Sequence, residues 1–294
     1  MKKVLLTGAT GFIGSHCIEP LLQRGYEVHA VAGSSMPPQL KGVTWHQADL
    51  MRNARELVES VDPSHLLHLA WHVVPGQFES LQNYRWVSAS MDLLTHFCGE
   101  RVLMCGSGYE YDWGYGYCTE SRTPLTPNTV YGSCKHALHT MAQSFATQNS
   151  LSFAWGRVFF LYGPREHPDR LVSSVVRSLL KNEPAKCSHG KQFRDYMHVQ
   201  DVANGLVAAL DSPVQGAVNI SSAHATPLRD IVQSIGEQLG KSELIRLGAL
   251  PARPNDTPLV IGDNTKLVSE TGWQQTFELE AGLRHTIDWW RSVL

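Results

Sequence analysis

The chain has 294 residues, 43% hydrophobic and 18% charged, as expected of a globular protein with a full-sized core. A formal net charge of −2 leaves no basic surface for nucleic acid or an anionic membrane, so neither partner is expected. The six cysteines form no C-x-x-C pair and predict free thiols, and no apolar run approaches the ~20 residues of a membrane span. We therefore expect a cytoplasmic protein.

Strands and helices alternate through the first half of the chain. The apolar patterns and turn signals predict strands at 4–6, 27–31, 43–47, 65–69, 101–105 and 153–159, and helices at 12–24, 53–60, 77–98 and 130–149. This alternation predicts an α/β fold with a Rossmann-type doubly wound parallel sheet.

The alternation is looser in the second half. Residues 108–129, rich in Gly, Tyr, Pro and Thr, are predicted to form a long ordered loop. Further helices are expected at 168–181, 201–211, 226–239 and 278–293, and short strands around 184–198 and 216–221. We expect a dinucleotide-binding domain at 1–163 and a smaller C-terminal α/β substrate lobe at 164–294. The chain can cross back to the first domain around 196–222.

A glycine-rich turn lies between the first strand and the first helix. Gly8 permits a tight turn, Gly11 lets the backbone approach a pyrophosphate, and Gly14 lets the helix pack close to the strand. The unpaired N–H groups at the start of the helix favour an anion. The segment that is predicted to hold the dinucleotide comprises Gly8, Thr10, Gly11, Phe12, Ile13 and Gly14.

The end of the second strand bears on NAD against NADP. An acidic residue there would bind the ribose 2′-hydroxyl, but the chain reads Ala32, Gly33, Ser34, which favours NADP(H) over NAD(H). Asp49 could accept a hydrogen bond from the adenine amino group, or instead cap the following helix. The other predicted cofactor contacts are Leu50, Leu69 and Ala70.

Tyr131 and Lys135 are four residues apart on a predicted helix and so share one face. A lysine ammonium and an oxidised nicotinamide nearby are expected to lower the pKa of the phenol, which can then exchange a proton with a carbonyl oxygen. The lysine would also hold the nicotinamide ribose. Ser107, just past the fifth strand, could polarise the same carbonyl.

Several motifs occur in a characteristic order: TGATGFIG, His68-Leu69-Ala70, Ser107 with Tyr111, Tyr131-x-x-x-Lys135, Arg157-x-x-x-x-Tyr162-Gly163-Pro164, and Arg194-Asp195-Tyr196-x-His198-Val199-x-Asp201-Val202-Ala203. The whole chain thus resembles extended short-chain dehydrogenases/reductases of the NAD-dependent epimerase/dehydratase family. The resemblance implies that Ser107, Tyr131 and Lys135 are the catalytic triad.

The same resemblance assigns Arg194 and Arg253 to the diphosphate of a nucleotide-sugar substrate. A guanidinium suits phosphate oxygens, although salt bridges to Asp195 and Asp256 are the alternative. A homodimer through the helices 77–98 and 130–149 is also implied. The predicted substrate contacts are Trp71, Ser107, Gly108, Tyr109, Phe160, Arg194, Arg253 and Asp256.

Departures from the family pattern narrow the activity. Nucleotide-sugar 4,6-dehydratases carry an Asp-Glu pair after the catalytic hydroxyl, where this chain has Gly108 and Tyr109; Glu110 is shifted by one residue and is expected to point elsewhere. Many epimerases have Asn where this chain has Phe160. The segment 247–273 is similar to reductases of the abequose-synthase type, which reduce a nucleotide-linked 4-keto-6-deoxyhexose.

Two further groups of residues have more than one possible role. His65 and His68, three apart on a strand, lie on opposite faces, so packing is favoured and no metal site is predicted. The aromatic run of the long loop could stack on a sugar or base, or simply stiffen the loop; it comprises Tyr109, Tyr111, Trp113, Tyr115 and Tyr117.

The predicted function is an NAD(P)H-dependent reductase of a nucleotide-linked 4-keto-6-deoxy sugar, with Tyr131 as the proton donor. The alternative is a nucleotide-sugar 4-epimerase with retained NAD. A protein that senses NADP(H) without turnover is less favoured, because such relatives usually lose the tyrosine or the lysine and this chain keeps both.

Overall fold

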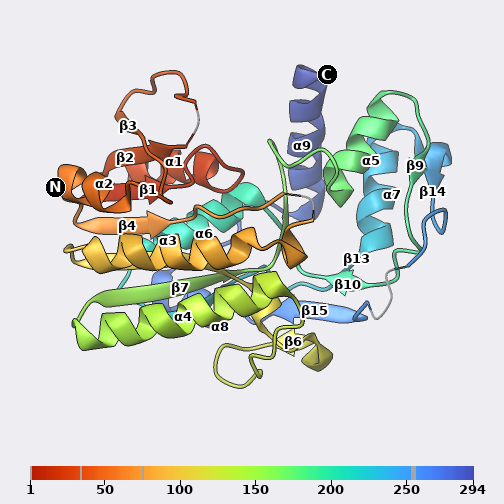
Figure 1. The fold of residues 1–294 in the computed structure, drawn as a ribbon. Helices are drawn as coiled ribbons and strands as arrows, with labels where there is room; N and C mark the ends of the chain where they lie inside the picture. Colours follow the sequence, from red (N-terminus) through yellow and green to blue (C-terminus); the bar gives the residue numbers. More distant parts are fainter. Residues whose placement is uncertain (1, 34, 75, 253–255) are drawn as a thin grey trace.

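A seven-stranded parallel sheet organises the molecule (Figure 1). The computed structural model describes residues 2–33, 35–74, 76–252 and 256–294. The strand order is β12-β7-β5-β4-β1-β2-β3. The bounds are β1 (Lys3–Thr7), β2 (Glu27–Ala32), β3 (Val43–Gln47), β4 (His65–His68), β5 (Arg101–Ser107), β7 (Ser152–Val158) and β12 (Gly216–Ile220). The predicted doubly wound α/β sheet is confirmed.

Helices cover both faces of the sheet (Figure 1). On one face α1 (Gly14–Gln23) packs against α6 (Val199–Asp211), over a core that includes Leu21 and Leu206. On the other, α2 (Ala54–Val61), α3 (Gln82–His96) and α4 (Val130–Gln148) lie side by side over a second core that includes Leu66 and Leu93. Since β1 lies between β4 and β2, the strand order reverses there, and the carboxyl edge at that point is where such sheets bind ligands.

The smaller lobe is built from three helices and short strands. Helices α5 (Leu171–Leu180), α7 (Leu228–Leu239) and α9 (Leu279–Val293) pack on one another around Val176, Ile235 and Ile287. The remaining helix is α8 (Thr265–Thr271). The short strands are β6 (Tyr117–Cys118), β8 (Phe160–Tyr162), β9 (Ala185–Lys186), β10 (Phe193–Arg194), β11 (Tyr196–His198), β13 (Thr226–Pro227), β14 (Ile245–Arg246) and β15 (Leu259–Gly262).

The structure differs from the predicted elements in three places. The predicted helix 77–98 is split into a 3₁₀ turn, η1 (Gln77–Glu79), and α3, because Ser80 is extended with ψ 133°. The loop 108–129 contains two more 3₁₀ turns, η2 (Gly108–Glu110) and η3 (Trp113–Tyr115), and β6. Finally, α8, β8, β14 and β15 were not predicted, since these short elements depend on distant segments: the strands pair with β11, β9 and β10, and α8 packs on α6 and β12.

Residues 199–220 lie with the large sheet, because α6 covers it and β12 pairs with β7 at its edge. The division into lobes at 1–163 and 164–294 remains a proposal. Residues 199–220 belong to the second range but pack with the sheet of the first. The six cysteines are free thiols. Within the described ranges, no helix is both long and apolar enough to cross a membrane.

Candidate active site

The glycine-rich turn after β1 is packed too tightly for side chains at two positions. Gly8 has φ +70°, and a Cβ there would lie 2.8 Å from the Ala70 amide nitrogen. A Cβ on Gly14 would lie 2.1 Å from the Gly8 carbonyl oxygen. Beside them Gly11 and Thr10 are exposed, and Phe12 and Ile13 are half-buried. The predicted glycine roles therefore have a steric basis at Gly8 and Gly14.

The start of α1 suits an anion. Among the described residues, no side chain caps this helix terminus, and its first turn contains no acidic residue that would repel an anion. The Thr7 hydroxyl accepts hydrogen bonds from the Leu69 and Ala70 amides at 3.2 and 3.3 Å, which fixes the end of β1 against the residues after β4. This arrangement fits the pyrophosphate of a dinucleotide.

The end of β2 carries no carboxylate, as read from the sequence. Gly33 is exposed, and Ser34 lies outside the described residues. The Ala48 amide donates to the Ala32 carbonyl at 3.1 Å, so Asp49 and the buried Leu50 follow directly beside this strand end. The Asp49 carboxylate accepts from the Met51 amide at 3.0 Å, while Asn53 is the N-cap of α2. The helix-capping alternative for Asp49 is therefore wrong.

Three predicted catalytic residues meet at the carboxyl end of β5. Ser107 is the last residue of β5, and Tyr131 and Lys135 lie on the buried face of α4, with 5%, 8% and 4% of their surfaces exposed. The Ser107 hydroxyl accepts from the Tyr109 amide at 3.3 Å and lies near enough to the Tyr131 phenol to favour its ionised form. The Lys135 ammonium donates to the Cys105 carbonyl at 2.7 Å and lies 3.7 Å from the ring centre of Trp71.

Burial dominates the protonation of this group. It raises the pKa of Tyr131, and the nearby Ser107 hydroxyl offsets only part of that rise. The lowering that is expected from Lys135 together with an oxidised nicotinamide stays a prediction. Burial also lowers the pKa of Lys135 to about 8. A neutral phenol is the protonation state that can donate to a carbonyl oxygen.

Aromatic rings surround Tyr131 on the side where the substrate is predicted, and this side is called the cleft below. The ring centres of Trp71, Phe78 and Tyr109 lie 6.4, 5.9 and 5.9 Å from that of Tyr131. Trp113 continues the wall, 4.3 Å from Tyr109 and 5.7 Å from Phe160. Phe78 was missed from the sequence, where it lies inside a predicted helix with no catalytic motif; the 3₁₀ turn brings it to the cleft.

The aromatic residues of the loop therefore fall into three groups. Tyr109 and Trp113 line the cleft, Tyr111 is buried in the core, and Tyr115 and Tyr117 are exposed. Tyr109 and Trp113 are thus the members of this run near Tyr131, and their stacking on a ligand stays a prediction. Gly108 lies under the Phe159 ring, where a Cβ would approach to 3.1 Å.

Arg194 lies at the outer end of this wall. Its guanidinium donates to Asp256 at 2.6 Å and lies 5.5 Å from the ring centre of Phe160. The neighbouring Asp195 does not pair with it but accepts from the amides of Ser222 and Gly262. Arg194 is thus held by a carboxylate at the place where a phosphate is predicted. Arg253 lies outside the described residues.

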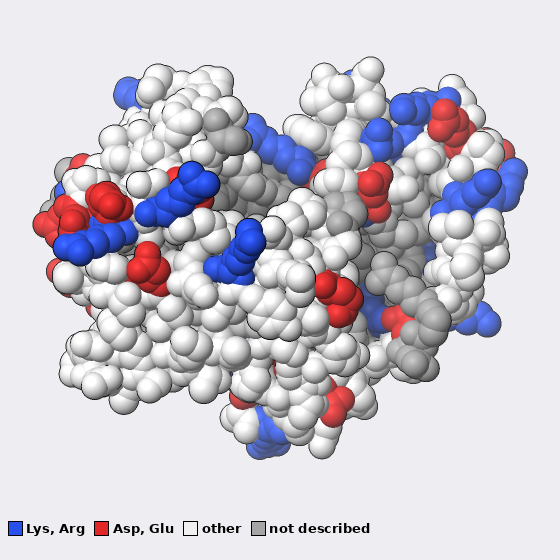
Figure 2. All heavy atoms as spheres, in the orientation of Figure 1, with Lys and Arg blue, Asp and Glu red and all other residues white. Residues whose placement is uncertain are grey.

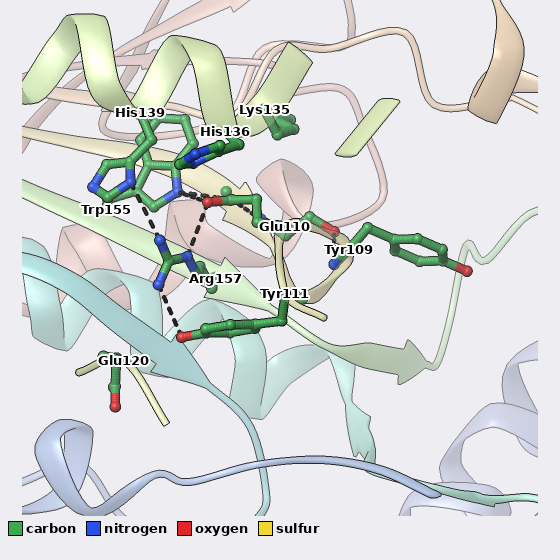
Figure 3. A network of polar contacts seen from close by, with 12 residues as sticks. Tyr109, Glu110, Tyr111, Glu120, Lys135, His136, His139, Trp155 and Arg157 are labelled. Atoms are coloured by element: carbon green, nitrogen blue, oxygen red, sulfur yellow. Dashed lines mark hydrogen bonds and ion pairs between the residues drawn. The ribbon is translucent and has the colours of Figure 1, made fainter. Parts of the chain in front are cut away.

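Glu110 points toward Trp155 and Arg157 and away from the Tyr109 ring, as Figure 3 shows, so it does point elsewhere as expected. Its carboxylate is buried against Trp155 and Arg157, whereas the Tyr109 side chain points in the opposite direction. Histidine packing is likewise confirmed: His68 contacts the hydroxyls of Thr7 and Ser90, and His65 packs edge-on against Tyr26.

Comparisons with known proteins agree with this geometry. UDP-glucuronic acid decarboxylase 1 of Xenopus tropicalis is 26% identical over 316 residues, which cover all of this chain and 73% of that protein. CDP-abequose synthase of Salmonella typhimurium is 24% identical, with 97% of each chain covered. The solved UDP-glucose 4-epimerase of Thermus thermophilus, in complex with NAD, is 25% identical with a TM-score of 0.88 over 99% of this chain and 100% of that one.

The family model of the NAD dependent epimerase/dehydratase family matches residues 4–221. That span includes the phosphate turn and all three candidate catalytic residues. Since it covers well over half of the chain, this protein is an enzyme that belongs to the NAD-dependent epimerase/dehydratase family, within the extended short-chain dehydrogenases/reductases.

Proposed function

We propose that this enzyme is an NADPH-dependent reductase of a nucleotide-linked 4-keto-6-deoxy sugar. The observation that carries the proposal is the contact between the Ser107 hydroxyl and a neutral Tyr131 phenol, next to the Lys135 ammonium. These three groups lie at the same edge of the sheet as the phosphate turn after β1.

Each of the three side chains has a separate role in carbonyl reduction. A bound reduced nicotinamide supplies a hydride to the keto carbon. Tyr131 donates its phenolic proton to the oxygen, so that the product is an alcohol, and Ser107 holds that oxygen by a hydrogen bond. The Lys135 ammonium stabilises the phenolate left on Tyr131, and its contact with Trp71 keeps the charge in place.

The aromatic wall supports a 6-deoxy sugar as the substrate. A methyl group and the apolar face of a sugar ring pack well against Phe78 and Tyr109, whereas a uronate carboxylate would need a cationic partner at that place. The absence of carboxylates at Gly108 and Tyr109 argues against elimination of water. The likeness to a CDP-abequose synthase along the whole chain supports the same class.

The diphosphate is proposed to bind Arg194, with Arg253 and Asp256 as neighbours. The exposed Gly33, and the absence of an acidic residue where β2 ends, support NADP(H).

A homodimer is proposed through α3 and α4. Figure 2 shows the surface over α4 without charged side chains, and Tyr84 and Met141 on these two helices are exposed.

An epimerase with retained NAD is the second candidate, favoured by the likeness to the Thermus thermophilus epimerase in complex with NAD. Phe160, in place of the Asn of many epimerases, argues against it. An epimerase would interconvert sugars without net oxidation of the cofactor.

The test is NADPH consumption with a panel of CDP-, dTDP-, GDP- and UDP-linked 4-keto-6-deoxyhexoses, with NADH and the parent sugar nucleotides as controls. One molecule of NADPH lost per molecule of alcohol formed supports the reductase. Interconversion of a parent sugar nucleotide without NADPH loss supports the epimerase. Tyr131→Phe should lower kcat by about 10³-fold and leave NADPH affinity unchanged.

A further inference from the structure

A carboxylate and a guanidinium are buried together beside the backbone of Ser107, and Figure 3 shows the two side chains, Glu110 and Arg157, next to each other. Glu110 and Arg157 have 0% and 1% of their surfaces exposed, and the Arg157 Nε donates to the carboxylate at 2.9 Å. Trp155 Nε1 donates to the same carboxylate at 2.9 Å. The Ser107 backbone N–H donates to Glu110 Oε1 at 2.8 Å. Glu110 thus binds the backbone of the residue that holds the substrate oxygen.

The neighbouring residues leave this carboxylate a single position. Gly106 has no side chain, and a Cβ there would lie 2.1 Å from Trp155 Nε1 and 2.6 Å from Glu110 Oε1. The remaining nitrogens of Arg157 donate to the Tyr111 hydroxyl at 2.9 Å and to His139 Nδ1 at 3.3 Å. Because every one of these partners is itself held, the carboxylate cannot shift without breaking several bonds.

Glu110, His136 and His139 place one possible ligand atom each within 4.8 Å of one another. The Arg157 guanidinium, however, is bonded both to the Glu110 carboxylate and to His139. A metal ion would have to displace that guanidinium and would then lie beside its charge. The contacts therefore describe an ion pair that organises the backbone rather than a cation site.

We propose that Glu110, locked by Trp155 and Arg157, is a positioning residue that sets the direction of the Ser107 hydroxyl toward the substrate carbonyl. The inference rests on the proposed function, because Ser107 matters only if the enzyme transfers hydride at a carbonyl carbon. Its physical basis is the steep dependence of such reactions on the placement of the hydrogen-bond donor, where an error of about 1 Å can cost about 100-fold in rate.

Two variants of Glu110 separate its hydrogen bond from its charge. Glu110→Gln keeps an acceptor for the Ser107 amide and should lower kcat by about tenfold, whereas Glu110→Val removes the acceptor and should lower kcat by about 100-fold. KM and the NADPH dissociation constant should stay unchanged in both. The matched control is Asp201→Asn, which alters another fully buried carboxylate, bonded to the amides of Thr276 and Phe277 away from the cleft. It should leave kcat unchanged at a comparable loss of thermal stability.

A double-mutant cycle with Ser107→Ala distinguishes positioning from general destabilisation. If Glu110 acts through the serine hydroxyl, Glu110→Val should change kcat by less than about threefold once that hydroxyl is absent. If the fold-changes in kcat of the two single variants instead multiply in the double variant, the inference is overturned. The Glu110 charge also raises the pKa of both Tyr131 and Lys135, so Glu110→Gln should move the basic limb of the pH–rate profile to lower pH. An unmoved profile would contradict the placement of that charge beside the triad.

Hydrogen exchange keeps this inference separate from the proposed function. A wild-type enzyme without activity on the substrate panel would reject the proposed function alone. The Ser107 amide, followed by mass spectrometry with NADPH present, should still exchange faster in Glu110→Val than in Asp201→Asn. Equal exchange in those two variants would reject the role of Glu110, whatever the activity assays show.

Discussion

The active-site region contains two buried arginine–carboxylate pairs that differ in how completely they are enclosed. Arg157 and Glu110 lie inside the core, and the nitrogens of the guanidinium are shared among Glu110, Tyr111 and His139. Arg194 and Asp256 lie at the outer end of the cleft, where 21% of the aspartate side chain is exposed and Arg194 also faces an aromatic wall.

Because they differ in enclosure, the two arginine–carboxylate pairs are suited to different roles. A fully enclosed pair cannot exchange partners, because either charge left alone would be buried without compensation. It is suited to holding a backbone in place. A pair with one side open can exchange its carboxylate for a phosphate oxygen at little cost, since a guanidinium binds both in the same way. We therefore expect changes at the inner pair to affect stability and kcat, and changes at the outer pair to affect KM.

The largest effect is expected from breaking the inner pair on one side. Arg157→Met leaves the Glu110 charge buried without its partner and should lower the free energy of unfolding by about 3–5 kcal/mol. Urea denaturation followed by fluorescence measures it. As a control, Arg55→Met removes an exposed pair with Glu59 and should leave the free energy of unfolding nearly unchanged. If the two variants lost similar stability, the inner pair would not differ from a surface pair.

The pH dependence of the free energy of unfolding tests the burial of Lys135. Its pKa is lowered from 10.5 to about 8 by burial, so the unfolded chain binds more protons between these values. The destabilisation caused by burying the Lys135 ammonium is fully present below pH 8 and disappears as the pH rises to 10.5. Relative to Lys135→Met, the wild-type free energy of unfolding should therefore rise across this window, by about 3 kcal/mol at about 1.4 kcal/mol per unit. Parallel curves for the two proteins would place the ammonium in water.

Arg194 should report on binding alone. Arg194→Met removes the charged donor proposed for the diphosphate and should raise the KM of the nucleotide sugar by about tenfold or more, with little change in kcat. Initial rates at varied substrate concentration separate the two constants. A fall in kcat at unchanged KM would move Arg194 from the binding half of the site to the chemical half.

The smallest effect is expected at Asp256. If its carboxylate competes with the substrate for Arg194, Asp256→Asn should lower KM by about two- to threefold, because a carboxylate binds the guanidinium more strongly than an amide does. The same initial-rate assay measures this change. A tenfold rise in KM would instead identify Asp256 as a direct ligand of the substrate.

Features that depend on residues close together in the chain could be predicted from the sequence. The turn at Gly8 and Gly14 depends on residues within one strand–turn–helix unit, and Tyr131 and Lys135 share a face because α-helix periodicity places residues four apart together. The strand starting at 43 and the helix starting at 130 were predicted at their observed first residues for the same reason.

Contacts between distant segments could not be read in this way. Arg157 joins Glu110 across 47 positions of the chain, and Arg194 joins Asp256 across 62. Each of these carboxylates had several equally plausible partners in the sequence. The burial of the Tyr131 phenol could not be predicted for the same reason, since the rings of Phe78 and Tyr109 that pack around it come from other elements.

By itself, then, the sequence determined the sheet, the phosphate turn and the identity of the chemical groups, because hydrophobic periodicity and short motifs act over a few residues. Only the tertiary structure decided which of those groups are enclosed and which face the cleft. Enclosure depends on how many neighbours from distant segments surround a side chain, and here it buries both charges of the Arg157–Glu110 pair but leaves Asp256 of the outer pair partly exposed.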